Sequence, residues 1–159
     1  MQVNTSKRTE LIDITDHVKK HVTESGIQNG ICIVSTMHTT TAIIINENEP
    51  GLVTDILTLR GRIVPEGAGY QHDRIDNNAD AHLRAVLLGN SESIPIRDGR
   101  LVLGTWQSIF LAELDGPRKR TVDITVIGRI NGTESRTVRK ISTKNLKSRP
   151  YEPAYFEGA

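Results

Sequence analysis

The chain has almost no cysteine and no long apolar run. Cys32 is the single cysteine among 159 residues, so no disulfide can form within the chain, which favours a reducing compartment. No apolar run approaches the roughly 20 residues that a membrane-spanning helix needs. No basic start followed by an apolar stretch marks a secretion signal. These absences predict a cytoplasmic protein without a membrane partner.

Nucleotide-binding loops and a strong charge imbalance are also lacking. Neither the GxGxxG nor the GxxxxGK[ST] pattern occurs, so nucleotide binding through either loop is not supported. The formal net charge is +1, which argues against a general nucleic-acid-binding protein. Nucleic-acid binding through a basic C-terminal stretch is a weaker alternative. Such basic runs are more often a solvated arm, so nucleic acid is not expected as a partner. Its basic residues are Arg136, Arg139, Lys140, Lys144, Lys147 and Arg149.

What is present is the pattern of one α+β domain. Helices are predicted within residues 13–26, 50–65 and 79–89, where apolar residues recur at helical spacing or a capping residue precedes them. Strands are predicted at the start of the chain and within residues 30–49, 92–96, 101–114 and 120–130. This order predicts a compact, mainly antiparallel, β-sandwich-like body with about three helices. We expect a single domain over residues 1–132 and an extended C-terminal arm over residues 133–159.

Two of the five histidines are candidates for a shared centre. His72 follows a glycine-containing loop, and His82 lies near the start of a predicted helix ten residues later, with acidic residues between them. A helix N-terminus disfavours an imidazolium, and a neutral imidazole can bind a metal or accept a proton. Ordinary loop and capping histidines are the alternative. His17 and His21 have helical i, i+4 spacing but lack the glutamate of HExxH, so a packed helix is favoured there.

A second candidate region runs from Trp106 to Arg118. Trp106 and Gln107 precede an apolar strand, and Glu113 lies near its end. Arg118 follows a Gly-Pro turn and could present its planar guanidinium to a phosphate or a carboxylate. A charged hairpin with an aromatic core residue is the alternative.

The stretch HTTTAIIINENE, residues 38–49, has polar groups at both ends. If residues 38–47 form one extended strand, His38 and Glu47 are about 30 Å apart. Within one chain they cannot touch the same small ligand unless a turn interrupts the strand. In a head-to-tail ring, one end of the strand can meet the other end of a neighbour's strand.

Several motifs together resemble the YjbQ-like family, also called secondary thiamine-phosphate synthases. They are HTTTAIIINEN, the Tyr70-x-His72 pair, NADAHL and LLGNSESIPIRDGRLVLGTWQSIFLAELDGPRKR. The resemblance covers about residues 5 to 130 and leaves the tail outside. It implies a compact α+β fold with a β-sandwich-like body, a homotrimer, and sites near subunit interfaces. The motif residues are His38, Asn46, Glu47, Asn48, His72, His82, Trp106, Gln107 and Glu113. The turn that carries Arg118 resembles only part of the family.

The resemblance also implies a reaction, regarded in the family as secondary. A thiazole phosphate nitrogen attacks the methylene carbon of a pyrimidine diphosphate, and pyrophosphate leaves. Because the leaving group gathers negative charge, a divalent metal such as Zn or Mg, or cationic side chains, should stabilise the transition state.

Each motif residue then receives an expected role. His38, His72 and His82 are expected to form a metal or acid-base centre, with Glu47 as a ligand or base. Arg118 and Gln107 are expected to orient phosphate. The remaining substrate-binding candidates are Asn46, Asn48, Trp106 and Glu113. The competing interpretation is a non-enzymatic trimeric protein that binds a metal or a small phosphorylated metabolite.

Overall fold

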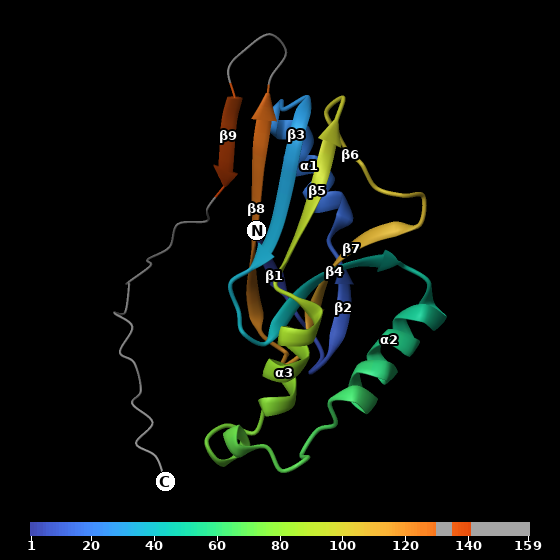
Figure 1. Ribbon diagram of the computed structural model, residues 1–159, viewed down its shortest axis with the longest axis vertical. Coiled ribbons are helices and arrows are strands. Elements are labelled where there is room, and N and C mark those ends of the chain that lie inside the picture. Colours follow the sequence, from blue (N-terminus) through green and yellow to red (C-terminus); the bar gives the residue numbers. More distant parts are fainter. Residues whose placement is uncertain (130–134, 141–159) are drawn as a thin grey trace, which may run out of the picture.

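The computed structural model describes residues 1–129 and the backbone of residues 135–140. Two antiparallel sheets and three α-helices make up the described chain (Figure 1). The predicted α+β class, antiparallel pairing and number of helices are therefore confirmed. The helices are α1 (Thr15–Ser25), α2 (Pro50–Ile63) and α3 (Ala79–Leu88), with a short 3-10 turn, η1, at Gln71–Arg74. No helix among the described residues is long and apolar enough to span a bilayer.

The larger sheet has six strands, and the smaller sheet has three. The larger has the order β1-β8-β3-β5-β6, with β9 also paired to β8, and the smaller has the order β2-β7-β4. The strands are β1 (Gln2–Asn4), β2 (Glu10–Asp13), β3 (Asn29–Thr36), β4 (Thr41–Glu47), β5 (Ser91–Arg97), β6 (Arg100–Leu101), β7 (Gln107–Glu113), β8 (Lys119–Arg129) and β9 (Ser135–Lys140). Strand β9 lies within the predicted C-terminal arm, whereas residues 141–159 are outside the described residues.

The main core lies between the two sheets and α1. It combines side chains such as Val18 from α1, Val34 from β3, Leu111 from β7 and Val126 from β8, all fully buried. Alternation along β8 places every second residue in this core, as strand geometry requires. A smaller cluster joins Ala81 and Ala85 of α3 to Ala42 and Ala112 of the three-stranded sheet. The small alanine side chains let α3 lie close to this sheet.

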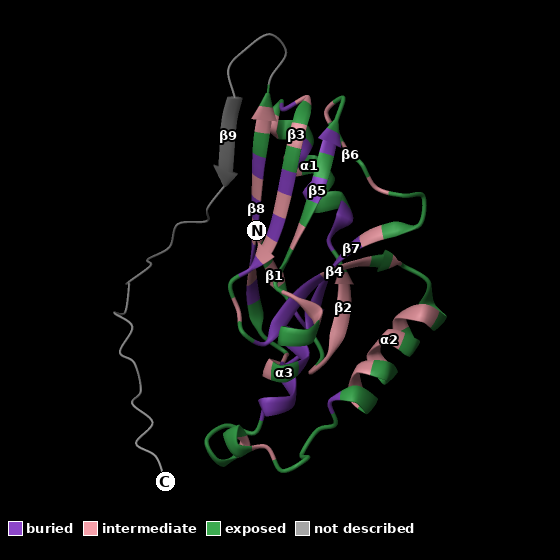
Figure 2. Cartoon of the chain, viewed as in Figure 1, coloured by how far each residue is buried: buried purple, intermediate pink, exposed green. Residues whose placement is uncertain are grey.

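Helix α2 depends on local signals more than on packing. Pro50 opens the helix, and the Glu49 side chain accepts hydrogen bonds from the amides of Gly51 (2.8 Å) and Leu52 (2.7 Å). This is the standard way to satisfy the free amides of a first turn. All 14 residues of α2 are described, and none of them is buried. Figure 2 shows the helix in the colours of exposed and intermediate residues along nearly its whole length.

A turn divides the predicted strand region 30–49 into two strands, so residues 38–47 are not one extended strand. Strand β3 ends at Thr36, residues 37–40 turn, and β4 begins at Thr41. The Thr36 and Thr41 hydroxyls hydrogen-bond across this turn. His38 therefore lies in a loop at the start of β4, while Glu47 is the last residue of the same strand. The two residues remain at opposite ends of β4.

Candidate functional site

The pairing of β4 with β7 divides the predicted site residues into two groups. Thr41 lies opposite Glu113 at one end of this ladder, and Glu47 lies opposite Gln107 at the other, six residues along β4. Six steps in a strand correspond to about 20 Å. We call the two groups the histidine end and the tryptophan end. The histidine end contains His38, His72, His82, Glu113 and Arg118, and the tryptophan end contains Asn46, Glu47, Asn48, Trp106 and Gln107.

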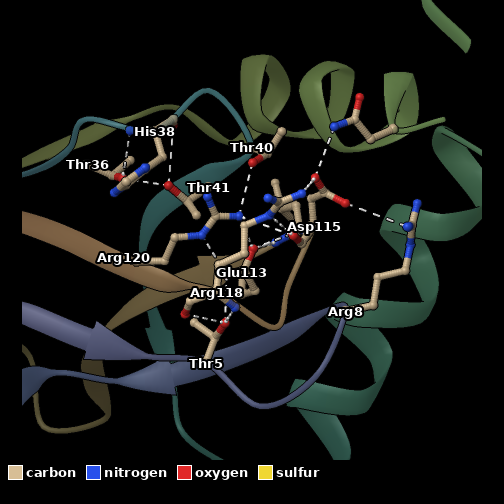
Figure 3. A network of polar contacts seen from close by, with 12 residues as sticks. Thr5, Arg8, Thr36, His38, Thr40, Thr41, Glu113, Asp115, Arg118 and Arg120 are labelled. Carbon is tan, nitrogen blue, oxygen red and sulfur yellow. Dashed lines mark hydrogen bonds and ion pairs between the residues drawn. The ribbon is translucent and has the colours of Figure 1, made fainter. Parts of the chain in front are cut away.

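His38 is held by the backbone of β8. The Thr121 amide donates a hydrogen bond to His38 Nε2 (2.8 Å). The Thr41 hydroxyl donates to the His38 carbonyl oxygen (3.3 Å) (Figure 3). A neutral imidazole that accepts at Nε2 carries its proton on Nδ1. His38 can therefore offer an N–H donor through Nδ1, while its Nε2 lone pair is already engaged.

A cavity of about 580 Å³ connects His38 with α3. Its wall includes His38 and Thr39 from the loop before β4, and His82 and Val86 from α3. A cavity of this size lies within the range that holds small metabolites. His38 and His82, which lie 44 positions apart in the sequence, thus face the same space.

His82 also contacts His72. Their ring centroids are 5.0 Å apart, and the rings are nearly perpendicular, at 77°. Both histidines line a neighbouring cavity of about 430 Å³, together with Tyr70 and Leu83. Among the described residues of this one chain, no group of three or more His, Cys, Asp or Glu side chains is placed to hold a metal ion. Of the three predicted metal ligands, His82 shares one cavity with His38 and the neighbouring cavity with His72.

A buried ion pair lies beside His38. Arg120 donates from Nε to Glu113 Oε2 (2.7 Å) and from Nη2 to Glu113 Oε1 (2.6 Å). Thr5 donates to the same carboxylate (2.9 Å), and Arg120 also donates to the Thr40 hydroxyl (3.0 Å). Figure 3 shows Glu113 at the centre of this network. Arg120 and Glu113 are 4% and 0% exposed, so Glu113 is committed to a structural pair.

The sequence carries a signal for this pair in the alternation of β7 and β8. Arg120 has the same parity as the buried residues Val122 and Ile124 of β8, and Glu113 has the same parity as Leu111 of β7. Residues two apart in a strand face the same side of the sheet. Glu113 ends β7 and Arg120 lies near the start of β8, the next strand along the chain, and both side chains face inward. Two opposite charges in these positions predict a buried ion pair.

The Arg118 guanidinium, which was a candidate to bind phosphate, is hydrogen-bonded to Asp115. Arg118 donates from Nε to the Asp115 carbonyl (2.8 Å) and from Nη2 to its carboxylate (2.9 Å). Asn78 donates to the same carboxylate (3.0 Å), and Arg8 Nη1 lies 3.6 Å from its other oxygen. Burial would raise the pKa of Asp115, but the hydrogen bonds from Asn78 and Arg118 outweigh it and lower the pKa. Half of the Arg118 side chain remains exposed.

The network also sets the charge state of His38. Burial lowers the pKa of His38, and the positive charge of Arg120 lowers it further, against the opposing effect of Glu113. For Glu113, burial would raise the pKa, but the hydrogen bonds from Arg120, the Asp115 amide and Thr5 outweigh burial and lower it. At neutral pH the site therefore combines a neutral imidazole with an ionised buried pair.

At the tryptophan end, predicted ligands make hydrogen bonds to other residues of the chain. Asn48 donates from Nδ2 to Asp13 Oδ2 (2.9 Å), and Gln107 Oε1 accepts from the Gly104 amide (2.7 Å). Asn46 Oδ1 accepts from the Glu47 amide (2.8 Å). Trp106 is 72% exposed. It therefore offers an open aromatic surface rather than a core side chain.

Similarity to known proteins covers most of the chain, including both ends of the β4/β7 ladder. The family model described as "UPF0047 protein YjbQ-like" matches residues 1–129. The chain belongs to this family. A UPF0047 protein of Methanothermobacter thermautotrophicus is 54% identical over 129 residues, which is 81% of this chain and 90% of that protein. A UPF0047 protein of Archaeoglobus fulgidus is 55% identical over 122 residues, which is 77% of this chain and 94% of that protein.

Solved structures of UPF0047 relatives have the same fold. A crystal structure of a YbjQ-like protein of unknown function from Sulfolobus solfataricus aligns with a TM-score of 0.80 at 47% identity, covering 81% of this chain and 94% of that one. A YjbQ/UPF0047 protein from Clostridium acetobutylicum aligns with a TM-score of 0.77 at 42% identity, covering 80% and 98%. The expected family and its β-sandwich-like fold are thus confirmed.

Breaking the buried pair should destabilise this UPF0047 protein strongly. We expect Glu113→Gln to lower the free energy of unfolding by about 3–5 kcal/mol, because Arg120 then remains buried without its counter-charge. Urea unfolding at neutral pH measures the change. Glu24→Gln, in an exposed pair with Lys20 on α1, is the matched control and should cost less than about 1 kcal/mol. Equal losses in the two variants would contradict the assigned role of Glu113.

His38 should titrate below the ordinary value of 6.5. At a pH between the lowered pKa of His38 in the folded chain and its ordinary pKa in the unfolded chain, the unfolded chain binds more protons. The free energy of unfolding is therefore highest above about pH 6.5 and falls as the pH drops below it. We expect the free energy of unfolding of His38→Gln to lack the part of this decrease that comes from His38. NMR titration of the His38 ring, with urea unfolding of both chains between about pH 7.5 and about pH 5.5, provides the test. A titration midpoint at or above 6.5 would show that the charge of Glu113 dominates.

Proposed function

We propose that the cavity between His38 and His82 is the reaction site of a secondary thiamine-phosphate synthase-type activity. The observation that supports this is one space, large enough for a small phosphorylated metabolite, lined by two imidazoles from different elements. In the proposed reaction, the thiazole nitrogen forms a bond to the pyrimidine methylene carbon while the bond from that carbon to the diphosphate oxygen breaks. The electron pair leaves with pyrophosphate, so the site must stabilise anionic oxygens.

The residues of the histidine end suit a divalent cation in part. His72 and His82, with ring centroids 5.0 Å apart, can approach one ion, and imidazole nitrogens suit Zn better than Mg. A bound ion would supply positive charge to the leaving pyrophosphate. His38 Nε2 already accepts from Thr121, so we assign His38 the role of an Nδ1–H donor to a phosphate oxygen. The ion therefore requires a further ligand besides His72 and His82.

We further propose that the complete site forms between copies in a homotrimer. Glu47, Gln107 and Trp106 lie at the far end of the β4/β7 ladder from the cavity, and one chain cannot bring them to the same ligand. Exposed apolar side chains lie at both ends, with Val86 81% exposed on the cavity wall and Trp106 72% exposed at the other end. Head-to-tail contact would cover both side chains and bring Glu47 of one copy to the histidines of the next. Glu47 would then act as the missing ligand or as a base.

A non-enzymatic binding role is the second candidate. Several predicted polar contacts to substrate are already engaged within the chain, among them Asn48 with Asp13, Gln107 with Gly104 and Arg118 with Asp115. Groups fixed in this way suit a preformed binding surface for a metal or a small phosphorylated metabolite. Tight binding without turnover would favour this role.

His82→Ala should abolish both bound metal and synthase turnover, because His82 faces the main cavity and also contacts His72. Metal content by mass spectrometry and formation of thiamine phosphate are the two measurements. His17→Ala, an exposed histidine on α1, is the matched control and should change neither. Unchanged metal and turnover in His82→Ala would rule out the proposed site, and loss of metal alone would favour the binding role.

A complementation experiment tests whether the site is shared between copies. His82→Ala and Trp106→Ala should each be inactive alone. In randomly mixed trimers, roughly a quarter of the interfaces pair two intact ends, so about that fraction of activity should return. Native mass spectrometry confirms that the copies have mixed. Mixed trimers without recovered activity would place the two ends in separate sites.

A further inference from the structure

A second, apolar groove lies between α2 and α3, away from the histidine cavity. Its volume is about 120 Å³, and its walls include Ile56, Leu59 and Ile63 from α2 and Leu87 from α3. Leu59 is 57% exposed and Leu87 is 65% exposed. Adjacent exposed leucines on two helices form an apolar surface that a partner can cover.

One arginine at this groove lacks an acceptor. Arg60 Nε and Nη1 are buried and have no hydrogen-bond partner within the part of the chain that the structure describes. Its neighbour Arg84 differs, because it donates to the Val64 carbonyl (3.0 Å from Nε and 2.7 Å from Nη2) and pairs with Asp80 (2.5 Å). Buried guanidinium groups are normally hydrogen-bonded to a carboxylate or carbonyl.

The acids near Arg60 are engaged by other arginines. Asp80 pairs with Arg84 and with Arg8 (3.2 Å), and Arg8 also pairs with Glu66 (3.3 Å) and lies 3.6 Å from Asp115. Burial and the positive charges of Arg84 and Arg8, against the opposing charge of Asp80, lower the pKa of Arg60 to about 10. The groove therefore calls for a partner that combines an apolar side chain with an anionic group.

The chain itself contains a segment of this chemistry. Residues 151–159, YEPAYFEGA, contain three of the six aromatic residues and two glutamates, with no Lys or Arg. The segment lies beyond the family match, which ends at residue 129. Strand β9 ends at Lys140. The ten residues between Lys140 and Tyr151 can span about 35 Å when extended.

We propose that residues 151–159 bind in the groove between α2 and α3, with an aromatic side chain against Leu59 and Leu87 and a glutamate accepting hydrogen bonds from Arg60. The segment supplies the two features that the groove lacks, apolar cover and a carboxylate. This interaction is independent of the reaction proposed for the histidine cavity. It uses a part of the chain that the family match does not reach.

Paired cysteines in the full-length chain test this proposal. We compare disulfide formation in Leu59→Cys/Phe156→Cys with that in Thr54→Cys/Phe156→Cys, in which the first cysteine lies on the opposite face of α2. The native Cys32 does not interfere, because it is buried and burial raises its pKa to about 12. We expect the Leu59 pair to form its disulfide at least about tenfold faster under mild oxidation. Adding Arg60→Gln should reduce this advantage, whereas Arg60→Lys should retain part of it.

Each other outcome overturns the proposal. Equal rates in the two pairs, or no disulfide in either, mean that the segment does not occupy the groove. If the Leu59→Cys positions of two different copies form a disulfide with each other in preference, the groove is covered by α2 of a second copy. An unchanged advantage in Arg60→Gln removes the contact between the segment's glutamate and Arg60. Metal content and synthase turnover, measured on the same variants, report on the histidine cavity separately.

Discussion

The ion pair between Arg120 and Glu113 anchors the part of the histidine end around His38. Arg120 belongs to the six-stranded sheet and Glu113 to the three-stranded sheet, so the pair ties the two layers together. Thr5 and Thr40 attach two loops to the same charges. Each group is hydrogen-bonded, which avoids the cost of leaving a buried charge unpaired. Because Thr121 directly follows Arg120, the amide that holds His38 is placed by the same pair.

The predicted site residues lie at opposite ends of one ladder, and the site that we propose needs both ends. The histidine end supplies imidazoles and a cavity, whereas the tryptophan end supplies an aromatic surface and carbonyl or carboxylate oxygens. A rigid ladder of β4 and β7 holds them apart. Bending within a chain cannot bring them together, since both strands are hydrogen-bonded along this length. In the homotrimer that we propose, contact between copies would combine them and would also cover the exposed apolar side chains at each end.

The sequence predicted elements well and contacts less well. The alternation of Val122, Ile124 and Val126 predicts β8, and helical spacing from Ile14 to Val22 predicts α1, because both patterns follow from local geometry. The β-branched residues Thr39, Thr40 and Thr41 favour a strand, whereas the turn at residues 37–40 is held in part by the contact of Thr40 with the distant Arg120, which local pattern does not reveal. The contacts of Asn48 with Asp13 and of Gln107 with Gly104 could not be predicted, because polar residues that hold another segment look the same in a sequence as polar residues that bind a substrate.

Asp13 links the tryptophan end to the helix beneath it. One of its oxygens accepts from the Thr15 amide at the start of α1, and the other accepts from Asn48 in the loop before α2. Burial would raise the pKa of Asp13, but hydrogen bonds from the Thr15 hydroxyl, the Thr15 amide and Asn48 outweigh it and lower the pKa. A ligand that draws Asn48 away would weaken the anchoring of the first turn of α1. Amide hydrogen exchange at Thr15 thus becomes an internal reporter of occupancy at a surface that Thr15 itself does not touch.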